Sequence, residues 1–232
     1  METILFSHIP KTAGSSLTQV IEAEYTPEER TAVYAGELRL AAPDSNFLNS
    51  FLQNPVAPKI VYGHFSYGVH EFLGLRPRYF SFLREPVARI ESLYDQLGKP
   101  DSQFFRAIRD GLSLAELIEQ NLTEMTNNHM TRAISGIPAQ PGSLVTDSRH
   151  LEAAIKNIER DYFFLGTVES AAKDFSALAD TLGWKTSEMP HLNASTTVRP
   201  RCDENTRSLI VEHNQLDIAL YQWAKDRTQG KV

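Results

Sequence analysis

Residues 3–21, TILFSHIPKTAGSSLTQVI, contain the pattern that decides the fold of this chain. The stretch begins with an apolar run of strand composition, passes through a loop of small residues, and takes up helical spacing from Leu17 onward. A loop that enters a helix in this way gathers backbone N–H groups at the positive end of the helix dipole, which favours a bound phosphate or sulfate. Lys11 adds a full positive charge at the turn. We call this predicted site the anion loop; its residues are Lys11, Thr12, Ala13, Gly14, Ser15 and Ser16.

The order of residues in the anion loop separates it from the loop of nucleoside triphosphatases. The Walker A pattern, G-x-x-x-x-G-K-[ST], places its lysine directly after a second glycine. Here Lys11 and Thr12 precede Gly14, and no other glycine lies upstream, so a Walker A loop does not fit. An ordinary strand-to-helix turn with a serine N-cap is the alternative for the small residues alone. The lysine at the turn favours the anion site.

A second candidate anion site follows the apolar run 79–83, YFSFL, at Arg84. The carboxyl end of a parallel strand delivers the next residue to the ligand-binding edge of the sheet. Ser92 lies about two turns into the helix that Pro86 begins. Taken singly, Arg84 could pair with Glu85, and Ser92 could be a solvated helix residue. Two such sites, each after a strand, together indicate a ligand with two anionic groups.

The composition indicates one acidic domain. The chain has 232 residues, 41% of them hydrophobic, which suits a single domain over residues 1–232. Its formal net charge of −6 argues against nucleic acid or an anionic membrane as the main partner. The single cysteine, Cys202, excludes an internal disulfide and a cysteine-based zinc site. The sequence shows no signal peptide and no apolar run of about 18 residues, so we expect a soluble, cytoplasmic protein without a membrane anchor.

Apolar runs alternate with amphipathic helices along the chain, which predicts a three-layer α/β fold with a central, mainly parallel sheet flanked by helices. Besides the first, strands are predicted at residues 59–64, 79–83 and 162–168. Helices are predicted at residues 86–97, 102–110, 125–135, 147–160 and 170–182, from Ser113 onward, and as one long C-terminal helix after Cys202. Residues 25–58 give little pattern apart from a short helix at 46–52.

Several blocks of the sequence resemble PAPS-dependent sulfotransferases, which use 3′-phosphoadenosine 5′-phosphosulfate (PAPS). PKTAGSS resembles their 5′-phosphosulfate-binding loop, and FSFLREPVARIESLY resembles their 3′-phosphate-binding motif. With YGHF, NHMTRAISG, FFLGTVES, HLNAS and NQLDIALYQWA, these blocks make the chain similar to carbohydrate-type sulfotransferases related to heparan sulfate 2-O-sulfotransferase. The resemblance implies a P-loop NTPase-like fold, PAPS as donor with PAP as product, and a carbohydrate or small metabolite as the hydroxylated acceptor.

The resemblance also implies roles for individual residues. Lys11 is expected to act in catalysis as well as in binding, where negative charge grows as the bond to sulfur breaks. The residues expected to bind the cofactor, besides the anion loop, are Arg84, Ser92, Asn193, Ser195 and Arg201, with Arg199 as an alternative to Arg201. The residues expected to face the acceptor are His70, Asn128 and Arg132. Surface positions on a loop or a solvated helix face are the alternative for the residues outside the two anion sites.

A general base is needed because the acceptor hydroxyl loses a proton as it attacks sulfur, and histidine suits this task near neutral pH. His64 is the predicted base, because it follows the run KIVYG and should reach the same sheet edge as Lys11 and Arg84. This Gly-His pair also aligns with the one that carries the proposed base in the related family. A structural histidine beneath the loop is the alternative, with His70 as the next candidate base. His8 is expected to brace the anion loop.

Two other function classes stay open. A nucleotide kinase needs Mg²⁺, usually held by an aspartate at the end of an apolar strand. The predicted strands end instead in Gly63-His64, Arg84 and Gly166-Thr167, so we expect no metal site. A protein that binds an anionic nucleotide or a sulfated glycan without turnover is the other class. His64 argues against it, because a pure binder needs no base.

Overall fold

The computed structural model describes residues 2–34, 38–39, 42–43, 51, 57–137, 146–186, 188–190 and 202–228. Its centre is a five-stranded sheet in the order β2–β5–β1–β6–β7, and each pairing in this sheet is parallel. The strands are β1 Ile4–Ser7, β2 Arg30–Val33, β5 Ile60–Gly63, β6 Tyr79–Leu83 and β7 Tyr162–Thr167, with a separate antiparallel pair of β3 Leu38–Arg39 and β4 Ala42–Pro43. The predicted α/β class with a central, mainly parallel sheet is confirmed.

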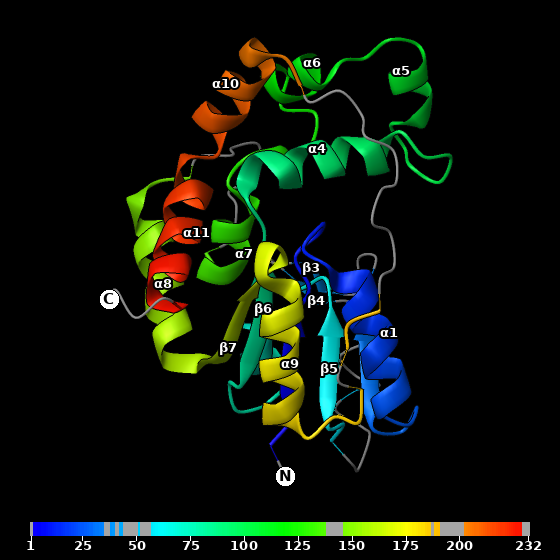
Figure 1. Ribbon diagram of the computed structural model, residues 1–232, viewed down its shortest axis with the longest axis vertical. Coiled ribbons are helices and arrows are strands. Elements are labelled where there is room, and N and C mark those ends of the chain that lie inside the picture. The colour runs from blue at the N-terminus through cyan, green and yellow to red at the C-terminus, as the bar shows by residue number, and fades with distance from the viewer. Residues whose placement is uncertain are drawn as a thin grey trace.

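Helices cover both faces of the sheet, and a further group lies beyond the carboxyl ends of its strands (Figure 1). α1 and α9 pack on one face, and α7, α8 and α11 pack on the other. The helices are α1 Gly14–Glu24, α3 Val69–Phe72, α4 Pro86–Leu97, α5 Phe105–Arg109, α6 Leu114–Glu119, η1 Glu124–Thr126, α7 His129–Ser135, α8 Ser148–Asp161, η2 Val168–Ser170, α9 Ala171–Leu182, α10 Glu204–His213 and α11 Gln215–Thr228. No helix within the described ranges is both long and apolar enough to cross a membrane.

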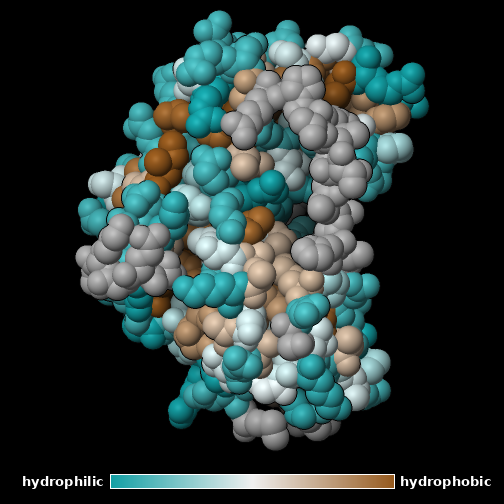
Figure 2. Space-filling view, in the orientation of Figure 1, coloured by the Kyte–Doolittle hydropathy of each residue, from teal (hydrophilic) through white to brown (hydrophobic). Residues whose placement is uncertain are grey.

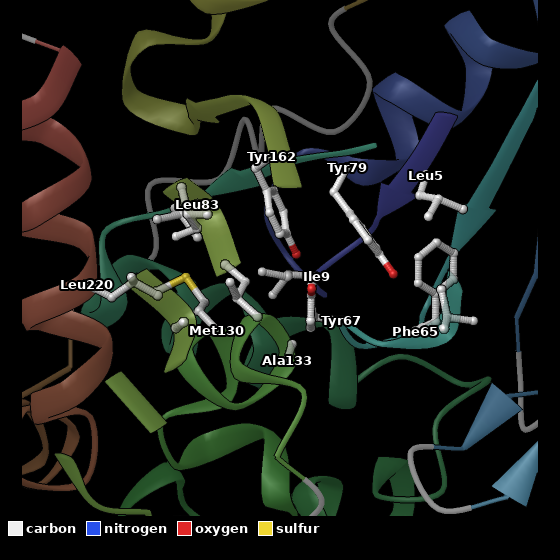
Figure 3. Close-up of a cluster of buried hydrophobic side chains, with 14 of the residues drawn as sticks. Leu5, Ile9, Phe65, Tyr67, Tyr79, Leu83, Met130, Ala133, Tyr162 and Leu220 are labelled. Carbon is white, nitrogen blue, oxygen red and sulfur yellow. The ribbon is translucent and has the colours of Figure 1, made fainter. Parts of the chain in front are cut away.

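Two apolar cores enclose the sheet. β1, β5 and β6 are buried along their whole length, which suits parallel strands covered on both faces. Successive residues point to opposite faces, so the neighbours Leu5 and Tyr79 belong to one core and the neighbours Phe6 and Phe80 to the other. Figure 3 shows the first core, where the rings of Tyr79 and Tyr162 stack with centroids 5.2 Å apart.

A third apolar cluster fixes α4 above the carboxyl edge of the sheet. It joins α4 to α6 and α10 through Ile90, Leu117 and Ile210, each of which is fully buried. Burial of such side chains contributes about 1.5–3 kcal/mol each. The helix that faces the carboxyl edge of the sheet is therefore firmly held by α6 and α10.

α7 and α11 cap each other's first turns. Asn128 Oδ1 accepts the two N–H groups at the start of α11, at 2.9 and 3.1 Å. Asp217, which is fully buried, accepts the N–H groups of Met130 at 3.2 Å and Thr131 at 2.7 Å in the first turn of α7. The guanidinium of Arg89, on α4, lies 3.9 Å from the same carboxylate. We call the pair Asn128 and Asp217 the helix interlock.

The prediction of a single long C-terminal helix is wrong. The chain breaks at Asn214 into α10 and α11. Asn214 Nδ2 donates to the carbonyl oxygens of Thr126 and Ile210, both at 2.9 Å, and its Oδ1 accepts the N–H of Asn128 at 3.0 Å. These bonds to distant segments compensate the break. The apolar spacing along the helix contains no sign of them.

Other predicted boundaries hold more closely. Strand 79–83 and helix 86–97 match the observed elements, and Ser113 forms the predicted capping box with Glu116. The predicted helix at 125–135 is divided into η1 and α7, because Asn128 takes a left-handed conformation with φ of 43°. The predicted helix at 102–110 begins only at Phe105. The short helix predicted at 46–52 lies outside the described residues except for Phe51.

Candidate active site

The anion loop joins the carboxyl end of β1 to the first turn of α1. Its backbone takes left-handed conformations at two residues that are not glycine, Lys11 with φ of 72° and Ala13 with φ of 67°. Such conformations cost about 1–3 kcal/mol each and occur preferentially at ligand-binding sites. Left-handed residues in a turn also direct successive N–H groups toward one side and form a concave cradle for an anion. The loop therefore has backbone geometry suited to phosphate or sulfate.

Some side chains of the anion loop brace it from within, and none of them caps the first turn of α1. Thr12 is fully buried and its hydroxyl donates to the carbonyl oxygen of Ile9 at 2.8 Å, so this hydroxyl proton is used inside the loop. Ser16 is buried and Ser15 is exposed. Ala13 is the N-cap of α1 and has no side-chain acceptor. The N–H groups of the first turn are therefore left for an external anion.

The second predicted anion site meets the first. Arg84 Nη1 donates to the carbonyl oxygen of Lys11 at 3.3 Å, so the guanidinium and the anion loop share one edge of the sheet. Glu85, the alternative partner of Arg84, is the N-cap of α4. Its carboxylate accepts the N–H groups of Val87 at 3.2 Å and Ala88 at 2.8 Å and is thereby directed to its own helix.

Positive charge is concentrated around Lys11. Burial lowers the pKa of Lys11 first, and the charges of Lys99 and Arg84 lower it further, while Asp95 acts in the opposite direction. An anion bound here would relieve the repulsion, because an opposite charge stabilises the protonated amine. Ser92 is half-buried on α4, two turns beyond Arg84. Figure 2 shows that this face of the molecule is hollowed below α4, with hydrophilic side chains along the upper border.

His64 reaches the same edge from β5. Gly63 has φ of 144°, and a Cβ there would lie 1.8 Å from the carbonyl oxygen of Val33, so the turn requires glycine. The His64 side chain is exposed on one side. On the other side its ring centroid lies 4.5 Å from that of His8 and 4.9 Å from that of Tyr34. Partial removal from water lowers the pKa of His64, so the imidazole is neutral at pH 7.

His8 lies between the anion loop and His64. Its ring stacks on Phe6 with centroids 5.7 Å apart and fills the space beside Gly14, where a Cβ would lie 1.6 Å from His8 Nε2. Burial, followed by the charges of His64 and Lys11, lowers the pKa of His8 to about 3. The neutral ring of His8 therefore packs directly on the first turn of α1, in keeping with the bracing role expected for it.

The arrangement of the sheet and its helices is also found in other solved structures. No family model matches the chain, and no curated protein matches it. A sulfotransferase from Alicyclobacillus acidocaldarius is similar in structure, with a TM-score of 0.53 and 15% sequence identity over 95% of this chain and 94% of that chain. The chain has the sulfotransferase fold. A mouse sulfotransferase, SULT7A1 complexed with PAP, gives a TM-score of 0.48 at 14% identity over 92% of this chain, which spans 63% of the mouse chain.

Within the sulfotransferase fold, His70 lies in the core. Only 8% of the residue is exposed, and Nδ1 lies 2.8 Å from the hydroxyl oxygen of Tyr79, a member of the core in Figure 3. Burial lowers the pKa of His70. The structure thus packs this histidine against Tyr79 and Tyr67, not in the open position expected for an acceptor-facing residue or an alternative base. The residue that buries it, Tyr79, lies nine positions further along the chain on β6, so the sequence next to His70 does not reveal the contact.

Asn128 and Arg132, both expected at the acceptor, use their polar atoms inside the fold. Asn128 belongs to the helix interlock, as described above. Arg132 Nε donates to the carbonyl oxygen of Asn127 at 3.1 Å, and its Nη2 donates to the carbonyl oxygen of Glu124. These contacts tie η1 to α7. The other residues expected to bind the cofactor lie outside the described residues: Asn193, Ser195, Arg201 and its alternative Arg199.

Three residues of the candidate site escaped the sequence reasoning. Tyr34 follows β2, whose short run RTAV lies in a segment for which no strand was predicted. Lys99 lies just beyond α4 and acts on Lys11. Glu169 lies in η2, and its carboxylate accepts the N–H of Glu85 at 3.0 Å and the hydroxyl of Tyr221 at 2.8 Å. It therefore secures the turn that carries Arg84.

Proposed function

We propose that this chain is a sulfotransferase that moves the sulfuryl group of PAPS to a hydroxyl of an acceptor. The observation that carries the proposal is the bond from Arg84 to the carbonyl oxygen of Lys11, which brings the guanidinium beside the anion loop. PAPS has anionic groups at both its 5′ and 3′ positions, and so matches this pair. The structural likeness to the sulfotransferase from Alicyclobacillus acidocaldarius supports the assignment.

The donor groups fit PAPS at both ends. The N–H groups of the anion loop and the Lys11 amine hold the 5′-phosphosulfate. In the transfer, the acceptor oxygen bonds to sulfur as the bond between sulfur and the bridging oxygen breaks, and that oxygen leaves with the 5′-phosphate. Arg84 holds the 3′-phosphate with charge-assisted hydrogen bonds, helped by the hydroxyl of Ser92. Lys11 has a second role, because its positive charge stabilises the negative charge that grows on the leaving phosphate oxygen.

His64 acts as the general base. Its imidazole is neutral because partial burial lowers its pKa, and a neutral imidazole can accept the proton that the acceptor hydroxyl loses. His64 keeps an exposed side at the carboxyl edge, where an acceptor can approach. We propose a carbohydrate or a small hydroxylated metabolite as acceptor, on the resemblance of the sequence blocks to carbohydrate-type sulfotransferases.

Ligand binding and transfer test the proposal separately. With PAP at a hundred times its Kd, the free energy of unfolding should rise by about 2.7 kcal/mol, and Mg-ATP should raise it less. Radiolabelled PAPS should transfer its label to at least one member of a panel of hydroxylated acceptors, and His64→Ala should bind PAP but transfer far less. A larger stabilisation by Mg-ATP than by PAP would contradict the assignment. PAP binding without transfer to any acceptor would point to a non-catalytic binder.

A further inference from the structure

Three aromatic rings from three different strand ends meet at the carboxyl edge of the sheet. His8 follows β1, Tyr34 follows β2 and His64 follows β5. The ring centroid of His64 lies 4.5 Å from that of His8 and 4.9 Å from that of Tyr34, and the His8 and Tyr34 centroids lie 6.0 Å apart. Each ring therefore contacts the other two, and His64 is the member that keeps an exposed side.

We propose that His8 and Tyr34 are positioning residues, which fix the orientation of the His64 ring and keep it neutral by excluding water from its inner side. The catalytic consequence of this inference rests on the proposed function. The inference assigns no chemistry to His8 or Tyr34 themselves. Their role is to set the proton affinity of the His64 imidazole, which is the proposed base.

His8 is unsuited to be the base itself. It is more deeply covered than His64, and its pKa of about 3 keeps it unprotonated at any working pH. One edge of its ring is occupied, since Nε2 faces Gly14 at the start of α1. Its Nδ1 lies 3.4 Å from the hydroxyl oxygen of Tyr34. A neutral, immobile ring acts on its neighbour mainly by displacing water, and this disfavours the charged form of His64.

Tyr34 anchors the cluster to α1. Its hydroxyl forms a hydrogen bond with Thr18 Oγ1 at 2.8 Å, and its ring meets His64 edge-on at an interplanar angle of 84°. Burial raises the pKa of Tyr34, so it remains an uncharged phenol. Tyr34 therefore also acts on His64 by packing against its ring and by excluding water from it. Edge-to-face packing of this kind holds an aromatic ring in one orientation.

The charged and titratable groups around the cluster favour the neutral forms of its rings. Lys11 in the anion loop disfavours a proton on His8, and His129 at the start of α7 lies near enough to His64 for their charges to interact. Burial keeps His129 neutral, because its pKa falls well below the usual value. Glu22 on α1 is the acidic group that acts on the cluster, and it acts on Tyr34. His64 therefore gains its neutrality from packing.

The cluster also sets the spacing between donor and base. His8 touches the first turn of α1 through Gly14 and touches His64 through its ring, so one side chain separates the predicted phosphosulfate cradle from the predicted base. A smaller residue at this position would admit water and also let His64 shift toward the loop. The inference thus predicts that both the pKa of His64 and its placement depend on His8.

NMR titration of labelled histidine in the full chain tests the inference without any turnover. In the wild type the His64 pKa should lie below 6.5. His8→Ala and Tyr34→Ala should each move it upward toward that value, and should move the acidic limb of the pH–rate profile upward with it. The matched variants His8→Leu and Tyr34→Phe keep most of the side-chain volume that packs against the His64 ring, and should leave the His64 pKa low. PAP binding by each variant reports whether the anion loop is intact.

The outcomes separate the inference from the proposed function. A His64 pKa that stays low in both alanine variants, with PAP binding retained, would overturn the inference. If the alanine variants fail to fold, the size-matched pair decides it: a low pKa in His8→Leu and Tyr34→Phe supports packing control, and a rise to the unperturbed value overturns it. If the His64 pKa moves as predicted but the protein transfers no sulfuryl group, the proposed function is contradicted and the positioning role of His8 and Tyr34 is still supported.

Discussion

Asp217→Asn should destabilise the protein far more than the change of one atom suggests. In the wild type this fully buried carboxylate accepts the N–H groups of Met130 and Thr131 and faces Arg89 at 3.9 Å. An asparagine keeps a single acceptor oxygen, so one helix N-terminal hydrogen bond is lost. The substitution also leaves the buried guanidinium of Arg89 without a counter-charge. Removing one partner of a buried ion pair costs about 3–5 kcal/mol, and we expect a loss in this range.

The structure predicts a different result for the partner. Arg89 is fully buried, and its Nε and Nη1 have no hydrogen-bond partner among the described residues. Arg89→Met removes these unpaired donors and the charge, at the expense of the bond from Nη2 to the carbonyl oxygen of Met125 at 2.8 Å. Asp217 keeps its two N–H partners in that variant. We expect a cost of about 0–2 kcal/mol, because replacing a poorly paired buried charge by an apolar side chain is often nearly neutral.

Urea unfolding of both single variants and of the double variant measures the difference. The double variant should be more stable than Asp217→Asn alone, because it no longer contains an isolated buried charge. The coupling between the two substitutions should be on the order of 1–3 kcal/mol. If Arg89→Met costs as much as Asp217→Asn, or if the two losses simply add, then the carboxylate does not balance the guanidinium and the reasoning is refuted.

The remaining predictions concern the proposed site. Arg84→Ala should weaken PAP binding by about tenfold to a hundredfold in calorimetry, yet hardly change the affinity for adenosine 5′-phosphosulfate, which lacks the 3′-phosphate. Lys11→Ala should lower kcat by about a hundredfold or more with a smaller loss of PAPS affinity. His64→Ala should instead keep PAP binding, lose about a hundredfold in transfer and remove the acidic limb of the pH–rate profile. Folded His8 stays neutral down to pH about 3, whereas unfolded histidine gains a proton near pH 6.5, so lowering the pH stabilises the unfolded state. Between pH 7 and pH 5 the free energy of unfolding of the wild type should therefore fall by about 2 kcal/mol more than that of His8→Leu, as measured by urea unfolding.

The predictions for Arg84, His64 and His8 have clear contrary outcomes. Equal losses of affinity for both nucleotides in Arg84→Ala would show that the guanidinium supports the fold and not the 3′-phosphate. Near-normal transfer by His64→Ala, with the acidic limb intact, would assign the base to another residue. The same dependence of stability on pH in wild type and His8→Leu would mean that His8 is hydrated in the folded state.

The parts of the site that follow strands could be predicted from sequence. His64 and Arg84 come directly after apolar runs, and Lys11 follows the first run by a few residues. The carboxyl ends of parallel strands meet at one edge, so local pattern was enough to bring these residues together. Tyr34 follows the same rule. It was missed because β2 has four residues, Arg30–Val33, of which only the last is buried. A strand this short at the edge of a sheet carries too little apolar pattern to stand out from a loop.

The contacts that depend on distant partners could not be predicted. Asn214 ends a helix by bonding to Thr126, which lies 88 positions away, and no local pattern encodes that meeting. Asn128 and Arg132 have polar side chains on a short helix, so a solvated or ligand-facing role was as consistent with their sequence as the buried role that the structure shows. Polar residues that serve the fold and polar residues that serve a ligand look alike until the partners are in place.

The left-handed residues of the anion loop have a consequence for the entropy of binding. Fixing the backbone of one residue costs about 1–2 kcal/mol in conformational entropy. In this loop the cost is met when the chain folds, since the hydroxyl of Thr12 and the ring of His8 brace the backbone from within the protein. A donor that arrives at a flexible loop must order it and forfeits part of its interaction energy in doing so. A donor bound as proposed would meet a cradle already in shape, and its attraction to Lys11 and to the N–H groups of the first turn would be expressed as affinity.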